Sequence, residues 1–320
     1  MKVLILTTQY LPHIGGSELA IKNLTERLPE VEFEIMSAKG PKWLMPITGV
    51  FRALNKKFDL IHVFQASYAG GAGWLLKLCF PKTPFIVSLQ EGKDLAQQSF
   101  FVKFFRKIIL KKADVITAIS TYLLDYAKKI NPRAKIYLLP NGVDPSLFYH
   151  KSSDYIFSAS RLVHKNGMDT LIEAMKLLPE QKLKIAGSGP QILPKLPNVE
   201  FLGSVPYDKL PAYMAHASVF VRPSRSEGMG SAFLDAMSAG VPVVATPVGG
   251  IPDFLKDHET GIFCTVDDPQ SVADAIREIL ENSALREKIV EQAYKMVTQR
   301  YDWDMLAKQY YEIINRHSRI

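Results

Sequence analysis

Cysteine is scarce in this sequence: Cys79 and Cys264 are the only two, and they stand far apart among apolar neighbours. Such a pair predicts two reduced, buried thiols in a cytosolic protein rather than a disulfide or a metal site. Long apolar runs are also missing, since no segment reaches the roughly 20 apolar residues of a membrane-spanning helix. The N-terminal run MKVLILTTQY is short and lacks a small-residue cleavage site, so it predicts a first β-strand rather than a secretion signal.

The dinucleotide fingerprint Gly-x-Gly-x-x-Gly is absent, and no acid follows the second predicted strand to hold a ribose. Both absences disfavour a dehydrogenase. The sequence also contains no internal repeat and no low-complexity segment.

What the sequence does contain is a regular alternation of short apolar runs and helical patterns. With 320 residues, 47% hydrophobic and 22% charged, the chain is long enough for two soluble domains. Strands that alternate with helices predict an α/β fold of two Rossmann-like, doubly wound parallel sheets. We place the domain boundary after His150, in the polar segment 150–154, which gives domains 1–150 and 151–300. The predicted strands are Lys2–Thr7, Phe33–Ser37, Asp59–Phe64, Pro84–Leu89, Asp114–Ile119, Lys135–Leu139, Tyr155–Ser160, Lys182–Ala186, Val199–Leu202, Ala217–Val221, Pro242–Thr246 and Gly261–Thr265.

The stretch from 222 to 250 carries the strongest motif, RPSRSEGMGSAFLDAMSAGVPVVATPVGG. It predicts a turn after a buried strand and then a helix from Ser231 to Ala239. Ligands of parallel sheets bind where strands end and helices begin, because unpaired N–H groups point outward there. Gly228 and Gly230 would let a ligand approach closely, and the N–H groups of Ser231 and Ala232 would meet a phosphate.

Two carboxylates, Glu227 and Asp235, accompany this predicted phosphate site. A carboxylate repels a phosphate, so we expect each to meet a sugar hydroxyl instead. A cationic pair, Arg161 and Lys165, follows the strand Tyr155–Ser160 and would suit a departing nucleoside diphosphate.

The stretch resembles the acidic signature of family 4 of the retaining nucleotide-sugar glycosyltransferases, in which Glu-Gly-Phe-Gly precedes a second Glu. The resemblance extends over nearly the whole chain. It implies that Glu227 meets the donor sugar and that Asp235, one methylene shorter than the family's Glu, meets the ribose. It also implies the GT-B architecture, with an N-terminal acceptor-side domain and a C-terminal nucleotide-sugar domain facing across a cleft. The terminal segment 301–320 would be a helix that packs back on the N-terminal domain.

Further residues follow from the same resemblance. Arg161 matches the family's Arg, whereas the family's Lys directly precedes the Gly, where this chain has Asn166; we therefore expect Lys165 to take its role. Gly203 begins the loop that borders the nucleotide base. Gly15 and Gly16 resemble the N-terminal Gly-Gly loop that faces the donor phosphates; from the residues alone, a plain turn is the default. The segment 70–73 could be a second ligand-facing loop or could only relieve crowding beneath a helix.

The fourth predicted strand ends beside Gln90 and Glu91, candidates for the acceptor side. Family members commonly carry His at the position of Gln90. Glutamine cannot act as a base near neutral pH, so that role is out of reach there. Glu91 is the nearest replacement, and a salt bridge from Glu91 to Lys93 is the alternative.

The segment 97–112 has five basic residues and no acidic one among four phenylalanines. Two interpretations remain open: a core helix with a solvated basic face, or a helix lying on an anionic membrane. The candidate membrane contacts are Phe101, Lys103, Phe104, Arg106 and Lys107, and the segments 42–46 and 51–57 could extend the same surface.

The resemblance, taken with these observations, implies a cytoplasmic, metal-independent retaining glycosyltransferase, which could also be peripheral on the membrane. It would move a hexose-type sugar from a UDP- or GDP-linked donor to a glycan or glycolipid hydroxyl, with no cofactor. The motif Asp302-Trp303-Asp304 precedes a helix and predicts a cap rather than a metal site. A sugar-nucleotide epimerase of the same fold, which would need no acceptor, is one alternative. A catalytically silent partner subunit, which would bind nucleotide without turning it over, is another. Although the formal net charge is +7, no nucleic-acid reading motif is present.

Overall fold

The computed structural model describes residues 1–11, 15–92 and 98–318, and the chain divides into two compact units. Unit 1 comprises Met1–Asn141 and Trp303–Ile320, and unit 2 comprises Gly142–Asp302. The division falls after Asn141 rather than after His150, because Val143 already donates its N–H to the carbonyl of Tyr301 in unit 2.

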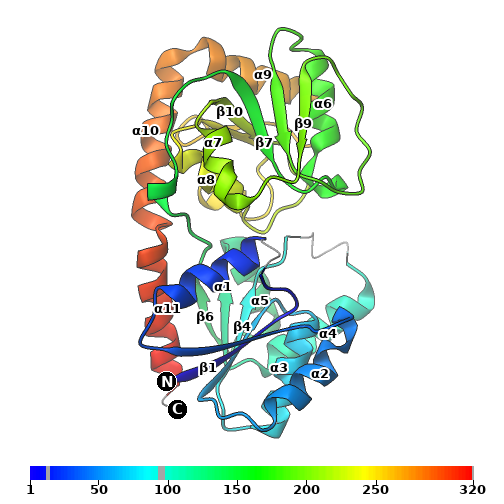
Figure 1. Cartoon of the computed structure of the whole chain (residues 1–320), viewed down its shortest axis with the longest axis vertical. Helices are drawn as coiled ribbons and strands as arrows, with labels where there is room; N and C mark the ends of the chain where they lie inside the picture. Colours follow the sequence, from blue (N-terminus) through cyan, green and yellow to red (C-terminus); the bar gives the residue numbers. More distant parts are fainter. Residues whose placement is uncertain (12–14, 93–97, 319–320) are drawn as a thin grey trace. The chain divides into compact units, whose positions relative to one another are not determined.

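Unit 1 is built on a six-stranded parallel sheet of order β2-β1-β3-β4-β5-β6 (Figure 1). The strands are β1 Lys2–Thr7, β2 Glu32–Ser37, β3 Leu60–Phe64, β4 Phe85–Leu89, β5 Val115–Ala118 and β6 Lys135–Leu138. The helices are α1 Gly16–Glu26, η1 Lys42–Leu44, α2 Met45–Ala53, α3 Tyr68–Cys79, α4 Phe100–Lys112, α5 Thr121–Ile130 and α11 Trp303–His317.

The terminal helix α11 belongs to the core of unit 1. Its buried side chains, among them Trp303 and Tyr310, pack with Ile21 of α1 and with Val3 and Ile5 of β1 in one hydrophobic cluster. Asp304 in its first turn accepts from Arg27 Nε at 2.6 Å.

The glycines of segment 70–73 lie inside helix α3, not in a loop. An added Cβ at Gly73 would come within 2.4 Å of Val63 and 2.6 Å of Phe85, both in the sheet. Gly73 lets α3 approach the strands, and Gly70 and Gly71 let side chains of α4 and α2 approach α3. Crowding therefore explains these glycines, and the prediction of a second ligand-facing loop was wrong.

Unit 2 is built on a second six-stranded parallel sheet of order β12-β11-β10-β7-β8-β9 (Figure 1). Its strands are β7 Tyr155–Ala159, β8 Leu183–Ala186, β9 Val199–Gly203, β10 Ala217–Arg222, β11 Val243–Ala245 and β12 Ile262–Phe263. Its helices are η2 Pro145–Leu147, η3 His164–Asn166, α6 Met168–Lys176, η4 Tyr207–Lys209, α7 Leu210–Met214, α8 Ser231–Ser238, η5 Ile251–Asp253, α9 Pro269–Glu281 and α10 Ser283–Arg300.

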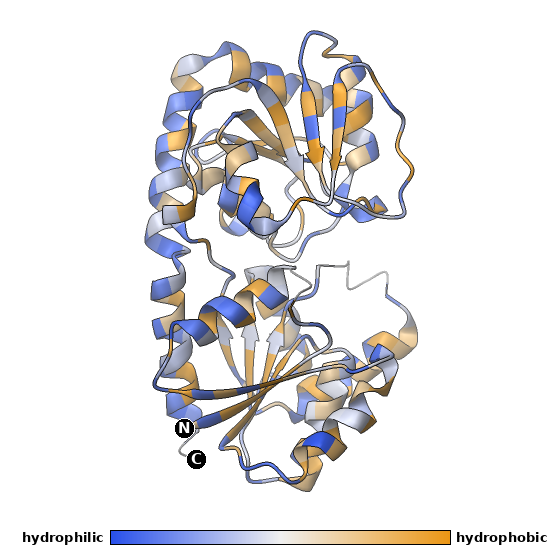
Figure 2. Ribbon diagram, in the orientation of Figure 1, coloured by the Kyte–Doolittle hydropathy of each residue, from blue (hydrophilic) through white to orange (hydrophobic). Residues whose placement is uncertain are grey.

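Both sheets confirm the predicted fold class of two parallel, helix-covered α/β layers, and Figure 2 shows hydrophobic residues concentrated along their strands. Every predicted strand is present, with ends that differ by at most two residues. The prediction of two buried thiols was wrong for Cys79, which is exposed at the end of α3, whereas Cys264 is buried. Across residues 1–11, 15–92 and 98–318, no helix is both long and apolar enough to cross a bilayer.

Candidate functional site

The site in unit 2 forms where the parallel strands end. The order of the sheet reverses between β10 and β7, since β8 and β9 lie to one side and β11 and β12 to the other. Such a switch point leaves room between the loops that follow the two central strands. The loop after β7 carries Arg161 and Lys165, and the loop after β10 carries Glu227.

Glu227 is held between two cations. Its Oε2 accepts from Nη2 of Arg222 at 2.8 Å, and its Oε1 lies 3.6 Å from Nζ of Lys165. The Glu227 side chain is 11% exposed, that of Lys165 20% and that of Arg222 7%, so a ligand could reach the first two more easily than the third. The structure therefore brings together Lys165 and Glu227, which the sequence predicted to share a site.

Burial and neighbouring cations act together on Lys165. Burial is the first cause that lowers the pKa of Lys165, and the charges of Arg222 and Arg161 lower it further, whereas Glu227 raises it. Arg161 is thus within electrostatic reach of Lys165 and is itself exposed. This arrangement concentrates positive charge around one carboxylate, as an anionic ligand would require.

The loop between β7 and α6 is fixed by its own contacts. Asn166, which stands where the family has Lys, is buried and donates Nδ2–H to the carbonyl of Arg161 at 2.7 Å. Arg225 bridges the two loops, because Nη1 donates to the carbonyl of His164 at 2.6 Å and to Asp169 at 2.8 Å. Asn166 is therefore used within the loop, and Lys165 is the lysine that reaches Glu227.

Helix α8 begins next to this cluster. Gly230 occupies its N-cap position with φ of +89°, and no side chain caps the helix. A Cβ at Gly230 would lie 2.5 Å from Nη2 of Arg222, so glycine is required both by the left-handed backbone and by this arginine. Ser231 and Ala232 form the first turn and are half-buried, whereas Gly228 is buried.

Asp235 points away from solvent. It is 2% exposed and its Oδ1 accepts from the hydroxyl of Tyr207 at 3.1 Å. Burial raises the pKa of Asp235 to about 7, opposed by the Tyr207 hydrogen bond and by the charge of Arg222. Gly203, at the end of β9, has φ of +68° and open space around it. Tyr207 follows that loop directly.

Two residues of this cluster were missed by sequence reasoning. Arg222 closes an apolar strand pattern and looked like part of the turn, yet it is buried, bonds Glu227 and stacks at 4.2 Å on the ring of Phe233. Tyr207 directly follows the loop that was predicted to border the base, and this position in the sequence could have marked it as a site residue.

The remaining predicted residues lie in unit 1. Gly15 is the N-cap of α1 and Gly16 its first residue, and a Cβ on Gly15 would lie 2.7 Å from Oε2 of Glu18. Their contact with donor phosphates stays a prediction. Gln90 and Asn141 exchange side-chain hydrogen bonds of 3.3 and 3.2 Å, so the Gln90 amide is engaged within unit 1.

The Glu91 side chain is 9% exposed and is engaged by neighbouring groups rather than presented to an acceptor. Its Oε1 accepts from the N–H of Ala66 at 3.0 Å and lies 3.6 Å from Nε of Arg106, while burial raises its pKa against the opposing charge of that arginine. The alternative partner, Lys93, lies outside the described residues. Arg106 is itself buried, so its assignment to an exposed membrane-contact face was wrong. Phe101, Phe104 and Lys107 are exposed, and Lys103 is half-buried; Gln97, where the predicted helix began, is outside the described residues.

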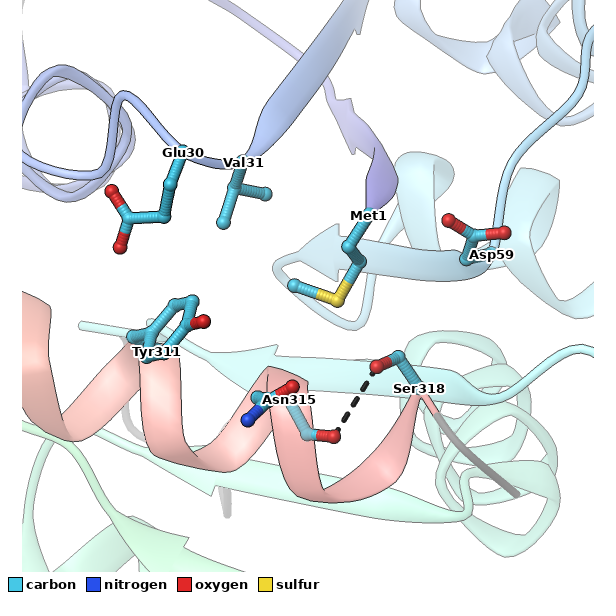
Figure 3. A pocket seen from close by; sticks show the side chains of 7 residues that line it. All are labelled: Met1, Glu30, Val31, Asp59, Tyr311, Asn315 and Ser318. Carbon is cyan, nitrogen blue, oxygen red and sulfur yellow. Dashed lines mark hydrogen bonds between the residues drawn. The ribbon is translucent and has the colours of Figure 1, made fainter.

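A cavity of about 340 Å³ lies elsewhere in unit 1, between the N-terminus and α11 (Figure 3). Its lining includes the carboxylates of Glu30 and Asp59 and the ring of Tyr311, and it contains none of the predicted site residues. Among the described residues, no group of three or more His, Cys, Asp or Glu side chains is placed to hold a metal ion.

Comparison with known proteins assigns both halves of the chain. Residues 146–296 match the family described as glycosyl transferases group 1, and residues 15–147 match glycosyltransferase family 4. The chain therefore belongs to the group 1 family of glycosyl transferases. A relative named an uncharacterized glycosyltransferase, from Methanocaldococcus jannaschii, is 32% identical, over 97% of this chain and 96% of its own length.

Two further proteins, one similar in sequence and one in structure, resemble this glycosyltransferase. A Mycobacterium tuberculosis protein named GDP-mannose-dependent alpha-(1-6)-phosphatidylinositol monomannoside mannosyltransferase is 32% identical, over 61% of this chain and 60% of its own length. Anabaena HepE, solved in complex with UDP-glucose, superposes with a TM-score of 0.85 at 19% identity, covering 99% of this chain and all of that one (100%). The latter likeness confirms the GT-B fold of the glycosyltransferase.

Proposed function

We propose that this glycosyltransferase moves a hexose-type sugar from a UDP- or GDP-linked donor to an acceptor hydroxyl, with retention of the anomeric configuration. The observation that carries the proposal is the carboxylate of Glu227 held between Lys165 and Arg222 where α8 begins. GDP-mannose in the name of the mycobacterial relative and UDP-glucose in the HepE complex support both donor bases.

In the proposed reaction, the bond from the anomeric carbon to the β-phosphate oxygen breaks and a bond to the acceptor oxygen forms on the same face. The proton of the acceptor hydroxyl passes to the departing phosphate. Negative charge grows on the diphosphate, and Arg161, Lys165 and the N–H groups of Ser231 and Ala232 would stabilise it. One preorganised donor of this kind contributes about 3 kcal/mol to transition-state stabilisation.

Glu227 would seat the donor sugar by accepting hydrogen bonds from the sugar hydroxyls, because Arg222 and Lys165 hold its carboxylate in place. The Tyr207–Asp235 pair would contact the ribose. The Asp235 side chain is itself buried, whereas Tyr207, which bonds it, is half-buried and lies beside the Gly203 loop. Gly15 and Gly16 would approach the donor phosphates. No step in the scheme needs a metal ion or another cofactor.

The acceptor is proposed to be a glycan or glycolipid hydroxyl at the cytoplasmic face of a membrane. The mycobacterial relative is named for a phosphatidylinositol monomannoside acceptor, which supports this class. Gln90 would adjoin the acceptor side without acting as a base. Glu91 would hold the loop through Ala66 and Arg106 rather than activate the hydroxyl, because its side chain is only 9% exposed.

The decisive experiment measures consumption of UDP- and GDP-hexoses by the full chain, with and without lipid and glycan acceptors and in EDTA. We expect acceptor-dependent turnover that survives EDTA, with an α-linked product from an α-linked donor. Glu227→Gln should lower turnover about 10³-fold, whereas Glu173→Gln, an exposed carboxylate of unit 2, should not. Donor conversion without acceptor would identify an epimerase, and binding without turnover by any donor would identify a silent subunit.

A further inference from the structure

Three helices of unit 1 form one layer against the sheet. Helix α3 packs between α2 and α4, and the contacts are close because glycines meet side chains from both neighbours (Figure 1). A Cβ on Gly71 would lie 3.1 Å from Pro46 of α2, and one on Gly70 would lie 3.1 Å from Ile109 of α4. The outward sides of α2 and α4 are therefore held in fixed positions on one support.

The outward side of α4 is aromatic. Phe100, Phe101, Phe104 and Phe105 are 74%, 70%, 48% and 59% exposed, whereas the inward side of the helix carries buried Arg106, Ile109 and Leu110. Within the described part of the chain, these four rings make aromatic contacts only with one another, at centroid distances of 5.8–6.1 Å. The core interpretation of the phenylalanines is excluded, since they face solvent.

The outward side of η1 and α2 repeats this pattern. Trp43, Ile47, Phe51 and Leu54 follow helical spacing and are 64%, 55%, 71% and 40% exposed, while Met45, Gly49 and Ala53 face inward. Figure 2 shows hydrophobic and hydrophilic segments alternating along both helices. Single exposed apolar residues are ordinary, but eight on the continuous segment η1–α2 and on α4, which pack on opposite sides of α3, indicate an interaction surface.

Within the two segments that carry these stripes, all charged residues are basic. Segments 42–57 and 98–113 contain no Asp or Glu, and their basic residues are Lys42, Arg52, Lys56, Lys57, Lys103, Arg106, Lys107, Lys111 and Lys112. Lys107, Lys111 and Lys112 are exposed and form no ion pair with any residue that the structure describes. Lysine is depleted at the centres of protein interfaces, whereas mixed lysines and aromatics are typical of helices that lie in the headgroup region.

We propose that the outward sides of η1, α2 and α4, here called the aromatic–basic face, dock unit 1 on an anionic phospholipid membrane. The phenylalanines and Trp43 enter the boundary between headgroups and acyl chains. The lysines extend toward lipid phosphates while their methylene stems cover apolar surface. This docking is independent of catalysis, and it would keep the enzyme at the surface where a lipid-borne acceptor lies.

The test is co-sedimentation of the full chain with vesicles of phosphatidylcholine alone or with phosphatidylglycerol at a ratio of about 7 to 3, without donor. We expect binding to the anionic vesicles that weakens with salt. The variant K107Q/K111Q/K112Q should bind anionic vesicles about 100-fold less tightly, since each cation near such a surface contributes roughly fivefold. F101S/F105S should weaken binding at least about tenfold, and this loss should persist at high salt.

Matched controls are I192S, an apolar side chain 97% exposed in unit 2, and K151Q/K182Q/K195Q, three exposed lysines of unit 2. Both controls should bind vesicles like the parent. Equal loss from the control and test variants, or no sedimentation of the parent, would overturn the proposal. A parent that self-associates through this face, shown by light scattering that F101S/F105S returns to monomer, and that ignores vesicles would identify a second copy as the occupant and would also overturn it. Because no donor is present, failure here leaves the transfer reaction untouched.

Discussion

Each unit buries a cluster of polar side chains, and the two clusters differ in charge and in how fully they are hydrogen bonded. In unit 1, His62 bonds the hydroxyl of Tyr310 through Nδ1 and that of Ser88 through Nε2, both at 2.7 Å, and Ser88 bonds Thr117 at 2.6 Å. In unit 2, charged Arg222, Glu227 and Lys165 meet at the end of a strand, and Arg222 Nε has no partner among the described residues.

We interpret the unit 1 cluster as structural and the unit 2 cluster as the candidate functional site. Burial lowers the pKa of His62 to about 3, so the unit 1 cluster is neutral, and each ring nitrogen has a partner. A satisfied neutral network rigidifies a core, whereas a buried charge with spare donors is costly unless a ligand completes it. We therefore expect substitutions in the unit 1 cluster to reduce stability and substitutions in the unit 2 cluster to reduce activity.

Substitution of Arg222 should give the largest effect, because we expect this residue to contribute both to stability and to activity. Arg222→Met leaves Glu227 without its 2.8 Å partner and should lower the free energy of unfolding by about 3–5 kcal/mol. Arg222→Lys should restore most of the stability but not the turnover, since lysine cannot reproduce the planar fork that holds the carboxylate. Chemical denaturation and donor turnover measured together test this, and full activity in Arg222→Lys would show that the planar guanidinium is not needed for turnover.

Lys165→Ala should have the second-largest effect and should reduce activity without reducing stability. It removes the cation nearest to Glu227 and should lower the turnover number by 10²- to 10³-fold, about 3–4 kcal/mol in the transition state. Since burial already lowers the pKa of Lys165, stability should change little. Lys176→Ala, on the exposed side of α6, is the control. A large loss of stability in Lys165→Ala would break the distinction between the units.

Much of this arrangement could be predicted from sequence, because alternating strands and helices fix a parallel sheet and bring the loops after its strands to one edge. That is why Lys165 and Glu227 could be assigned to one site although they come from different strands. The Tyr207–Asp235 hydrogen bond could not be predicted, since it joins residues 28 positions apart through tertiary packing.

The orientation of α4 was also beyond sequence analysis. Its phenylalanines recur at helical spacing, and spacing reveals a stripe without showing whether the stripe faces the core or solvent. The structure buries Arg106, Ile109 and Leu110 instead, because Gly70 of α3 receives Ile109 and Glu91 lies opposite Arg106.

Tyr310→Phe should have a smaller effect, on stability alone. It removes the hydroxyl that bonds His62 and leaves a buried ring nitrogen without its partner, at a cost of about 1–3 kcal/mol. Donor turnover should be unchanged at temperatures where the variant is folded. Thermal unfolding and turnover are compared with Tyr311→Phe, whose ring lies at the cavity beside the N-terminus. Reduced turnover in folded Tyr310→Phe would show that the unit 1 cluster serves catalysis.

The smallest effect is on the pH dependence of the parent's own stability, because the two clusters should act on it in opposite directions. His62 has its pKa lowered from 6.5 to about 3, so only the unfolded chain binds its proton between these values, and stability rises with pH there. Asp235 has its pKa raised from 3.8 to about 7, so only the folded chain holds its proton between these values, and stability falls as pH rises.

Between pH 4 and 6.5, each group contributes a slope of about 1 kcal/mol per pH unit, and the two slopes nearly cancel. Asp235→Asn removes the falling slope, so its stability relative to the parent should increase as pH rises from 4 to 7. His62→Gln removes the rising slope, so its stability relative to the parent should decrease as pH rises from 4 to 6.5.

Calorimetry at several pH values measures these slopes. The difference in stability between variant and parent, taken at each pH, isolates the contribution of the substituted group from those of all others. If the units unfold in separate transitions, each substitution should move only the transition of its own unit, and equal movement of both would show that the clusters are not independent.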